Sequence, residues 1–207
     1  QQIYELKTEV DIKVNRYIVM ENYLPVEFLE TNMDHFIDFS KTMYERYGLS
    51  IVFLPFHLAN GGMNQAELLG QNLDHYQFVD LSRYGFLPLQ DAIHVISGAE
   101  LVISSRYHAL VLAVGTRTPI INVLKDVVND KRYYYNKSVG VLQEVLQGIP
   151  FDERLYIGTD YIETLNHVKN HFDEIRDMQL ANYNEQFEKN MANLRAIRSN
   201  FIESVQE

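Results

Sequence analysis

An arginine and a histidine stand two residues apart in the most hydrophobic stretch of this 207-residue chain. The stretch VISSRYHALVLAVGTRTPIINV covers residues 102–123, and Ser104, Ser105, Arg106 and His108 interrupt its apolar run. A guanidinium offers a planar fork of donors that matches a phosphate or a carboxylate. An imidazole has an ordinary pKa of about 6.5 and exchanges protons at neutral pH. These residue types predict that a small anion is bound where a proton is transferred.

The elements that must position these side chains alternate between strand and helix. We expect strands at 16–20, 50–56, 76–81, 100–105, 119–123 and 154–159. We expect helices from Pro25 to Gly48, near 64–72, and over 88–97, 106–115 and 138–147, with a tyrosine-rich connection over 124–136. This alternation predicts an α/β, Rossmann-like fold with a doubly wound, mostly parallel, six-stranded sheet.

The pattern changes at Asp160. Asp160 and Glu163 resemble a capping box, and apolar residues then recur at helical spacing almost to the end of the chain. We expect one long helix or two. The predicted organisation is therefore an α/β domain over 1–159 and a C-terminal helical extension over 160–207.

A doubly wound sheet binds ligands beyond the carboxyl ends of its strands, where the winding reverses. The fourth strand normally lies beside the first at that reversal, and it ends here at Ser104 and Ser105. Arg106 then begins a helix, whose N-terminal N–H groups and dipole attract anions. On a regular helix His108 would lie about 200° around the axis from Arg106. The two side chains therefore converge only if the first turn is irregular or the ligand lies across the end of the helix. The alternative is that Arg106 pairs with a carboxylate such as Asp80 and that His108 is a hydrogen-bonded core residue.

Composition limits the classes of partner. A net charge of −10 and a pI near 5.1 argue against binding to nucleic acid. Cysteine is absent, so thiolate metal sites are excluded. The histidines at 35, 94 and 167 lie in separate expected helices without a ligand pair, so we expect no metal. No apolar run has the length of about 20 residues that spans a bilayer, and no leader opens the sequence, so we expect a cytoplasmic protein, free or peripheral to the inner membrane face.

Three segments in order resemble the polysaccharide pyruvyl transferase family. AELVISSRYHALVLAVGTRTPIINV (99–123) is similar to the family's strand, Arg-x-His, small-residue helix, Gly and Pro-led strand. GLSIVFLPFH (48–57) resembles its strand ending in Pro-Phe-His, and YNKSVGVLQEVLQGIP (135–150) its Tyr-Asp/Asn-Lys segment before a short helix. Two features depart from the family. Tyr107 replaces the usual Leu, and an apparent insertion over 124–134 leaves both Lys131 and Lys137 as candidates for the family's lysine.

The resemblance implies a fold of the GT-B type, of which this chain would be the C-terminal domain without its N-terminal half. Family members transfer a pyruvyl group from phosphoenolpyruvate to sugar hydroxyls, in making cell-surface polysaccharide. By this resemblance Arg106 holds the donor's phosphate or carboxylate, and His108 is the general acid or base. Lys137, or else Lys131, supplies a second charge. Ser104, Ser105 and His57 are further candidates for substrate contacts, and no cofactor or metal is required.

Two other functions remain open from the sequence. One is a GT-B glycosyltransferase that uses a nucleotide sugar, although no acidic residue that could hold ribose follows Arg106 before Asp126. The other is a non-catalytic module of the same fold, in which the helical tail serves association. The expected partners are an anionic small molecule and a saccharide acceptor, free or linked to a lipid or nucleotide; a homo-oligomer is compatible with the sequence.

Overall fold

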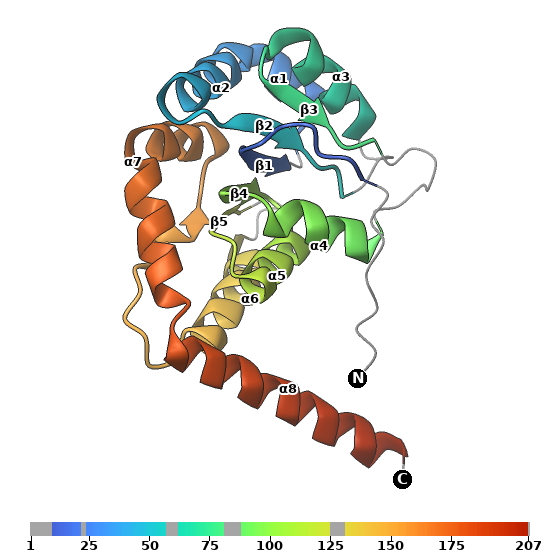
Figure 1. Ribbon diagram of the computed structural model, residues 1–207, viewed down its shortest axis with the longest axis vertical. Helices are drawn as coiled ribbons and strands as arrows, with labels where there is room; N and C mark the ends of the chain where they lie inside the picture. The colour runs from blue at the N-terminus through green and yellow to red at the C-terminus, as the bar shows by residue number, and fades with distance from the viewer. Residues whose placement is uncertain (1–9, 22–23, 57–61, 81–87, 125–130, 207) are drawn as a thin grey trace.

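A six-stranded, all-parallel sheet forms the centre of the molecule (Figure 1). The computed structural model describes residues 10–21, 24–56, 62–80, 88–124 and 131–206. The strands are β1 (Tyr17–Glu21), β2 (Ser50–Phe53), β3 (Tyr76–Phe78), β4 (Leu101–Ser104), β5 (Ile120–Val123) and β6 (Ile157–Gly158). Their order is β3-β2-β1-β4-β5-β6. The chain thus winds outward from β1 in one direction and from β4 in the other, which confirms the predicted doubly wound fold.

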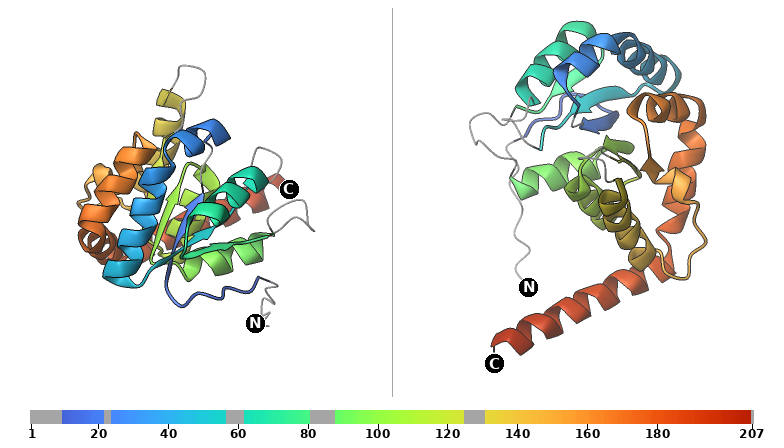
Figure 2. Two further views of the ribbon diagram at one scale, coloured as in Figure 1. Left: turned by 90° about the horizontal axis from the view of Figure 1, so that it is seen from above. Right: turned by 180° about the vertical axis from the view of Figure 1, so that it is seen from behind.

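Helices cover both faces of this sheet. They are α1 (Val26–Thr31), α2 (Met33–Tyr47), α3 (Met63–Asn72), α4 (Leu89–Ser97), α5 (Tyr107–Thr116), α6 (Lys131–Val145), α7 (Tyr161–Asn182) and α8 (Glu185–Gln206). In Figures 1 and 2, α1 to α3 lie on one side of the sheet and α4 to α6 on the other, while α7 lies beside α2. Right-handed crossovers produce this division, because the connection from β3 to β4 runs back across the sheet and the later connections continue in that direction.

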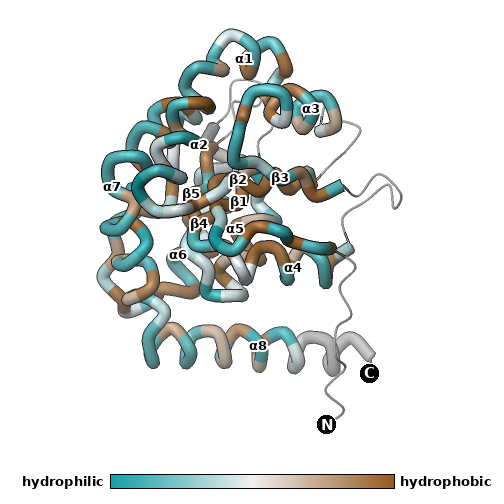
Figure 3. The backbone as a smooth tube through the Cα atoms, turned by 45° about the horizontal axis from the view of Figure 1, so that its top comes forward, coloured by the Kyte–Doolittle hydropathy of each residue, from teal (hydrophilic) through white to brown (hydrophobic). Residues whose placement is uncertain are grey.

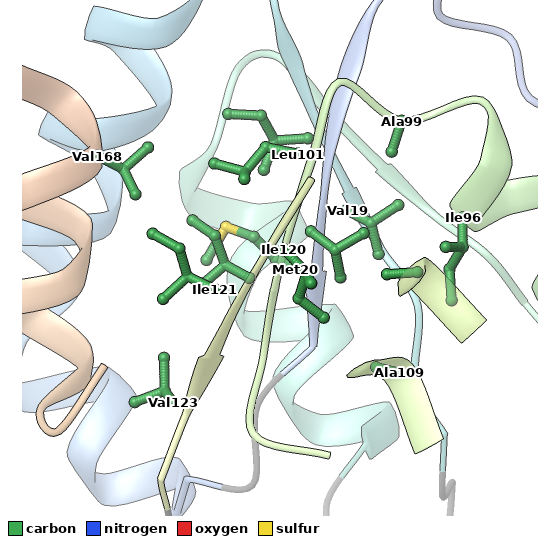
Figure 4. Close-up of a cluster of buried hydrophobic side chains, with 14 of the residues drawn as sticks. Val19, Met20, Ile96, Ala99, Leu101, Ala109, Ile120, Ile121, Val123 and Val168 are labelled. Atoms are coloured by element: carbon green, nitrogen blue, oxygen red, sulfur yellow. The ribbon is translucent and has the colours of Figure 1, made fainter. Parts of the chain in front are cut away.

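The inner strands β1, β2, β4 and β5 are short runs of mostly apolar residues because both of their faces are buried. Val19, Met20, Ile120 and Ile121 from the central strands are at most 1% exposed. Figure 4 shows these side chains packed between helices, with Val168 of α7 on one side. The hydropathy colouring in Figure 3 shows the same contrast, with apolar strands inside and more polar helices outside. The core therefore holds the strand ends rigidly in register.

Several element boundaries differ from those expected. The prediction of a connection over 124–136 was wrong for its last residues, because α6 begins at Lys131 and ends at Val145. The run of tyrosines there has no clear helical pattern, so the sequence gives no start signal. The last strand is two residues long and follows a short 3-10 helix, Glu153–Leu155. Gly48 ends α2 with a φ of 67°, as its expected role as a cap requires.

The C-terminal segment consists of two helices. The Asp160 side chain accepts a hydrogen bond from the Glu163 N–H at 2.8 Å, which begins α7 as the sequence predicts. Asn184 begins α8 by accepting from the N–H groups of Gln186 and Phe187. Several side chains of α7 belong to the same core as the sheet, and the division of the chain at residue 159 stays a prediction. No helix in the described ranges combines the length and apolar character of a membrane span.

Candidate functional site

The winding reverses between β1 and β4, where Glu21 and Ser104 are register partners. Arg106 follows two residues later as the N-cap of α5, with an extended backbone (φ −105°, ψ 131°). Arg106 is therefore outside the helix, which begins one residue later than expected. The helical angle of about 200° between Arg106 and His108 does not apply, because it requires both residues to be helical.

The Arg106 side chain pairs with a buried carboxylate. Its Nε donates to Glu21 Oε1 at 2.8 Å. Ser104 Oγ donates to Glu21 Oε2 at 2.8 Å and accepts from the Arg106 N–H at 3.0 Å. The Glu21 side chain is 2% exposed and that of Arg106 is 20% exposed. The structure thus agrees with pairing to a carboxylate, the alternative left open from the sequence, but the partner is Glu21 at the end of β1 and not the suggested Asp80.

A second buried group fixes the backbone of this junction. Asn122 of β5 donates from Nδ2 to the carbonyl oxygens of Ser104 at 2.9 Å and Arg106 at 3.2 Å. Its Oδ1 accepts from Ser138 Oγ of α6 at 2.8 Å. Asn122 and Ser138 are 3% and 2% exposed. Fully bonded buried groups of this kind specify one local conformation, so β5 and α6 determine the path of the chain around Arg106.

His108 and Lys137 meet at Tyr107. The Lys137 Nζ lies 3.9 Å from the centroid of the Tyr107 ring. The His108 ring lies 6.0 Å from the Tyr107 ring, with an angle of 71° between the planes. His108 is exposed, so the alternative of a core histidine was wrong. An exposed imidazole can exchange protons with a ligand or solvent.

The structure divides the predicted site residues into two groups. Ser104 and Arg106 gather around Glu21, whereas His108 and Lys137 lie against Tyr107. Ser105, which stands between Ser104 and Arg106 in the sequence, is buried. Lys131 is the first residue of α6 and its side chain is outside the description, and His57 lies outside the described residues.

Sequence reasoning missed Glu21, Asn122 and Ser138. Glu21 ends the buried run YIVME and Asn122 interrupts the buried run IINV, so each is a polar residue in an apolar strand. That pattern is a usable signal, because buried polar groups are seldom left without a partner. Ser138 has no comparable signal, because it only acquires its role from the register of α6 against β5.

Two hollows in the described surface lie away from this cluster. One of about 210 Å³ is lined by residues of α2 and of the turn before β3, including Lys41 and His75. The other, of about 230 Å³, lies between β6 and the start of α7 and includes Asp160 and His167. Neither includes Arg106, His108 or Lys137. The candidate site therefore rests on the buried polar network and on the position of the strand ends.

The described residues contain no group of three or more side chains suited to hold a metal ion. The expectation that His167 has no second histidine at helical spacing was nevertheless wrong. His171 stands four residues later, and the two ring centroids are 5.0 Å apart. Burial and the neighbouring His171 together lower the pKa of His167. The absence of a metal or cofactor from the reaction stays a prediction.

Comparisons with known proteins bear on the family and on the fold. A family model described as polysaccharide pyruvyl transferase matches residues 5–124. No curated protein sequence matches the chain significantly.

Two solved structures resemble the chain in fold. One is a protein assigned as a UDP-N-acetylglucosamine 2-epimerase from Listeria monocytogenes, with 17% identity, a TM-score of 0.52, and coverage of 92% of this chain and 46% of that protein. The other is a glycotransferase of kitacinnamycin, with 12% identity, a TM-score of 0.53, and coverage of 99% and 46%. Both have GT-B type folds, and this chain spans less than half of their length.

Proposed function

The chain belongs to the polysaccharide pyruvyl transferase family, and we propose that it forms the donor-binding part of an enzyme that moves a pyruvyl group from phosphoenolpyruvate to a saccharide. The observation that carries the proposal is the position of Arg106, Tyr107 and His108 at the β4–α5 junction, beside the reversal of strand order. Doubly wound folds bind their ligands at this edge.

The donor carries a carboxylate and a phosphate, so the site must supply positive charge. Glu21 holds Arg106 by its Nε and offsets its charge. The pair therefore fixes the orientation of the guanidinium more than it adds net charge. The remaining attraction comes from the N-terminus of α5, a ten-residue helix, and from Lys137. Fixed positive groups of this kind stabilise the charge that develops as phosphate leaves.

His108 is the proposed general acid or base. In forming a cyclic ketal, two sugar hydroxyl oxygens bond to C2 of the donor, C3 gains a proton, and the C2–O bond to phosphate breaks. Both hydroxyl protons must be removed: one reaches C3, and the other leaves with the inorganic phosphate. An exposed imidazole beside the proposed anion site can take up or donate such a proton.

A ligand comparison tests the proposal on the natural full-length gene product. We expect phosphoenolpyruvate to raise the melting temperature, because only ligands of the native state stabilise it by mass action. We also expect release of inorganic phosphate when a saccharide acceptor is added. Arg106→Ala should lose both responses, whereas Arg16→Ala, at the opposite end of β1, should keep them. Stabilisation by a UDP-sugar but not by phosphoenolpyruvate would replace the proposal with nucleotide-sugar chemistry.

A further inference from the structure

Tyr107 stands between the two residues to which chemistry is assigned. It is the first residue of α5, and its half-buried ring contacts the ammonium of Lys137 at 3.9 Å from the ring centroid. The face of an aromatic ring attracts a cation through its quadrupole at such distances. The contact joins the start of α5 to the second turn of α6.

The backbone next to Lys137 is fixed by a hydrogen bond between α6 and β5. Ser138, the next residue, donates its hydroxyl to Asn122 Oδ1 at 2.8 Å. Asn122 in turn bonds the carbonyl oxygens of Ser104 and Arg106. Lysine has a long, flexible side chain, and here both ends of it are restrained, the backbone through Ser138 and the ammonium through the tyrosine ring.

We propose that Tyr107 is a positioning residue that holds the Lys137 ammonium at the N-terminal end of α5, where it supplies the second positive charge for the anionic donor. The proposal rests on the proposed function for its ligand. It also decides between the two candidate lysines. Lys131 begins α6 six residues earlier, about 9 Å along the helix axis from Lys137.

The identity of residue 107 makes the proposal specific to this chain. The Arg-x-His segments that it resembles have Leu at this position, and an aliphatic side chain has no π face to attract a cation. Tyr107→Leu therefore removes the contact while keeping an apolar residue that suits the helix. Tyr107→Phe keeps the aromatic face and removes only the hydroxyl, so it is the matched control.

Nuclear magnetic resonance of ¹³Cε-labelled lysine tests the contact without any activity. We expect the Lys137 ε-methylene signal, assigned from its loss in Lys137→Arg, to be shifted upfield by the ring current in the wild type and in Tyr107→Phe. The shift should vanish in Tyr107→Leu. An unshifted Lys137 signal in the wild type would overturn the contact, and circular dichroism verifies that each variant is folded.

Kinetics on the natural full-length protein test the consequence. We expect Tyr107→Leu to raise KM for phosphoenolpyruvate roughly two- to fivefold with little change in kcat, because cation–π contacts at partly exposed sites have that strength. Tyr107→Phe should restore the wild-type KM. In Lys137→Met the further change Tyr107→Leu should have no effect on KM.

The resonance and kinetic experiments distinguish a failure of the Tyr107–Lys137 contact from a failure of the proposed function. A ring-current shift in a protein that neither binds nor consumes phosphoenolpyruvate would overturn the proposed function and leave the contact standing. Turnover of phosphoenolpyruvate with an unchanged KM in Tyr107→Leu would overturn the positioning role and leave the function standing.

Discussion

An arginine–glutamate pair joins β1 and β4 at each end of these two strands, and the two pairs differ mainly in burial. At the amino ends, Arg16 Nε lies 2.6 Å from Glu100 Oε1, with side chains 49% and 25% exposed. At the carboxyl ends, Arg106 Nε lies 2.8 Å from Glu21 Oε1, with side chains 20% and 2% exposed. The bond lengths are similar, so the bonds alone do not distinguish the two ends.

Their surroundings do distinguish them. Arg16 also donates to the Tyr47 carbonyl, and Glu100 also lies 3.4 Å from Arg176, in a group open to water. The hydrogen bond from Arg16 is the main cause that lowers the pKa of Glu100. Around Glu21, in contrast, a buried serine occupies the second carboxylate oxygen and Asn122 fixes the adjoining backbone. Removing a partner therefore leaves a solvated charge at one end and a desolvated charge at the other.

The two pairs therefore differ in the groups that they orient. The exposed pair lies at the end of the sheet where no ligand is expected in a doubly wound fold. The buried pair holds an arginine at the end where doubly wound folds bind their ligands.

Glu21→Gln should have the largest effect on stability. The amide keeps the shape of the side chain but cannot balance the guanidinium of Arg106. We expect the free energy of unfolding in urea to fall by roughly 3 kcal/mol, the lower end for breaking a buried pair. Glu100→Gln is the matched control and should cost less than about 1 kcal/mol. Equal losses in the two variants would remove the distinction between the ends.

Asn122→Ala should cost roughly 2 kcal/mol, because it leaves a buried and a partly buried carbonyl oxygen and the Ser138 hydroxyl without this partner. Asn72→Ala removes an amide bonded to the Leu68 carbonyl at an exposed position and should stay within about 0.5 kcal/mol of the wild type. Chemical denaturation measures both. A loss at Asn122 no larger than that at Asn72 would show that the junction does not depend on it.

Arg16→Met should cost at most about 1 kcal/mol, because exposed pairs gain little and salt screens them. We expect the difference from the wild type to shrink further in about 1 M salt. Thermal unfolding at low and high ionic strength tests this. A larger loss that persists in salt would mean that the amino end is as tightly built as the carboxyl end.

The smallest expected effect is a pH dependence at the exposed end. The folded pKa of Glu100 lies below its ordinary value of 4.5, so its stabilising contribution is present above that pH and is lost as the pH falls through the lowered pKa. The stability difference between the wild type and Glu100→Gln should therefore narrow below about pH 4.5. Urea titrations from pH 7 to pH 3 measure this difference in the free energy of unfolding. A difference that widens as the pH falls would contradict the prediction.

The sequence predicted most of the scaffold because its signals are local. Six apolar runs, the cap at Gly48 and the side-chain cap at Asp160 each follow from a few neighbouring residues. The position of Arg106 at the reversal followed from strand order alone.

The partners of Arg106 could not be predicted in the same way. Glu21 lies 85 residues from Arg106 in the chain, and Ser138 lies 16 residues from Asn122, so each contact depends on the register between elements. The start of α6 could not be predicted either, because the tyrosine run has no clear helical pattern.

Calorimetric titration of the natural full-length protein with phosphoenolpyruvate, comparing Arg106→Met with Arg16→Met, tests whether the donor binds at Arg106. The two changes remove the same chemical group from opposite ends of the same strand pair. We predict that Arg106→Met weakens binding at least about tenfold, since a charged hydrogen bond contributes about 1.5–3 kcal/mol, and that Arg16→Met leaves the Kd within about twofold of the wild type. Equal affinities in all three proteins, or a loss confined to Arg16→Met, would contradict the assignment of the donor site to the carboxyl ends of β1 and β4.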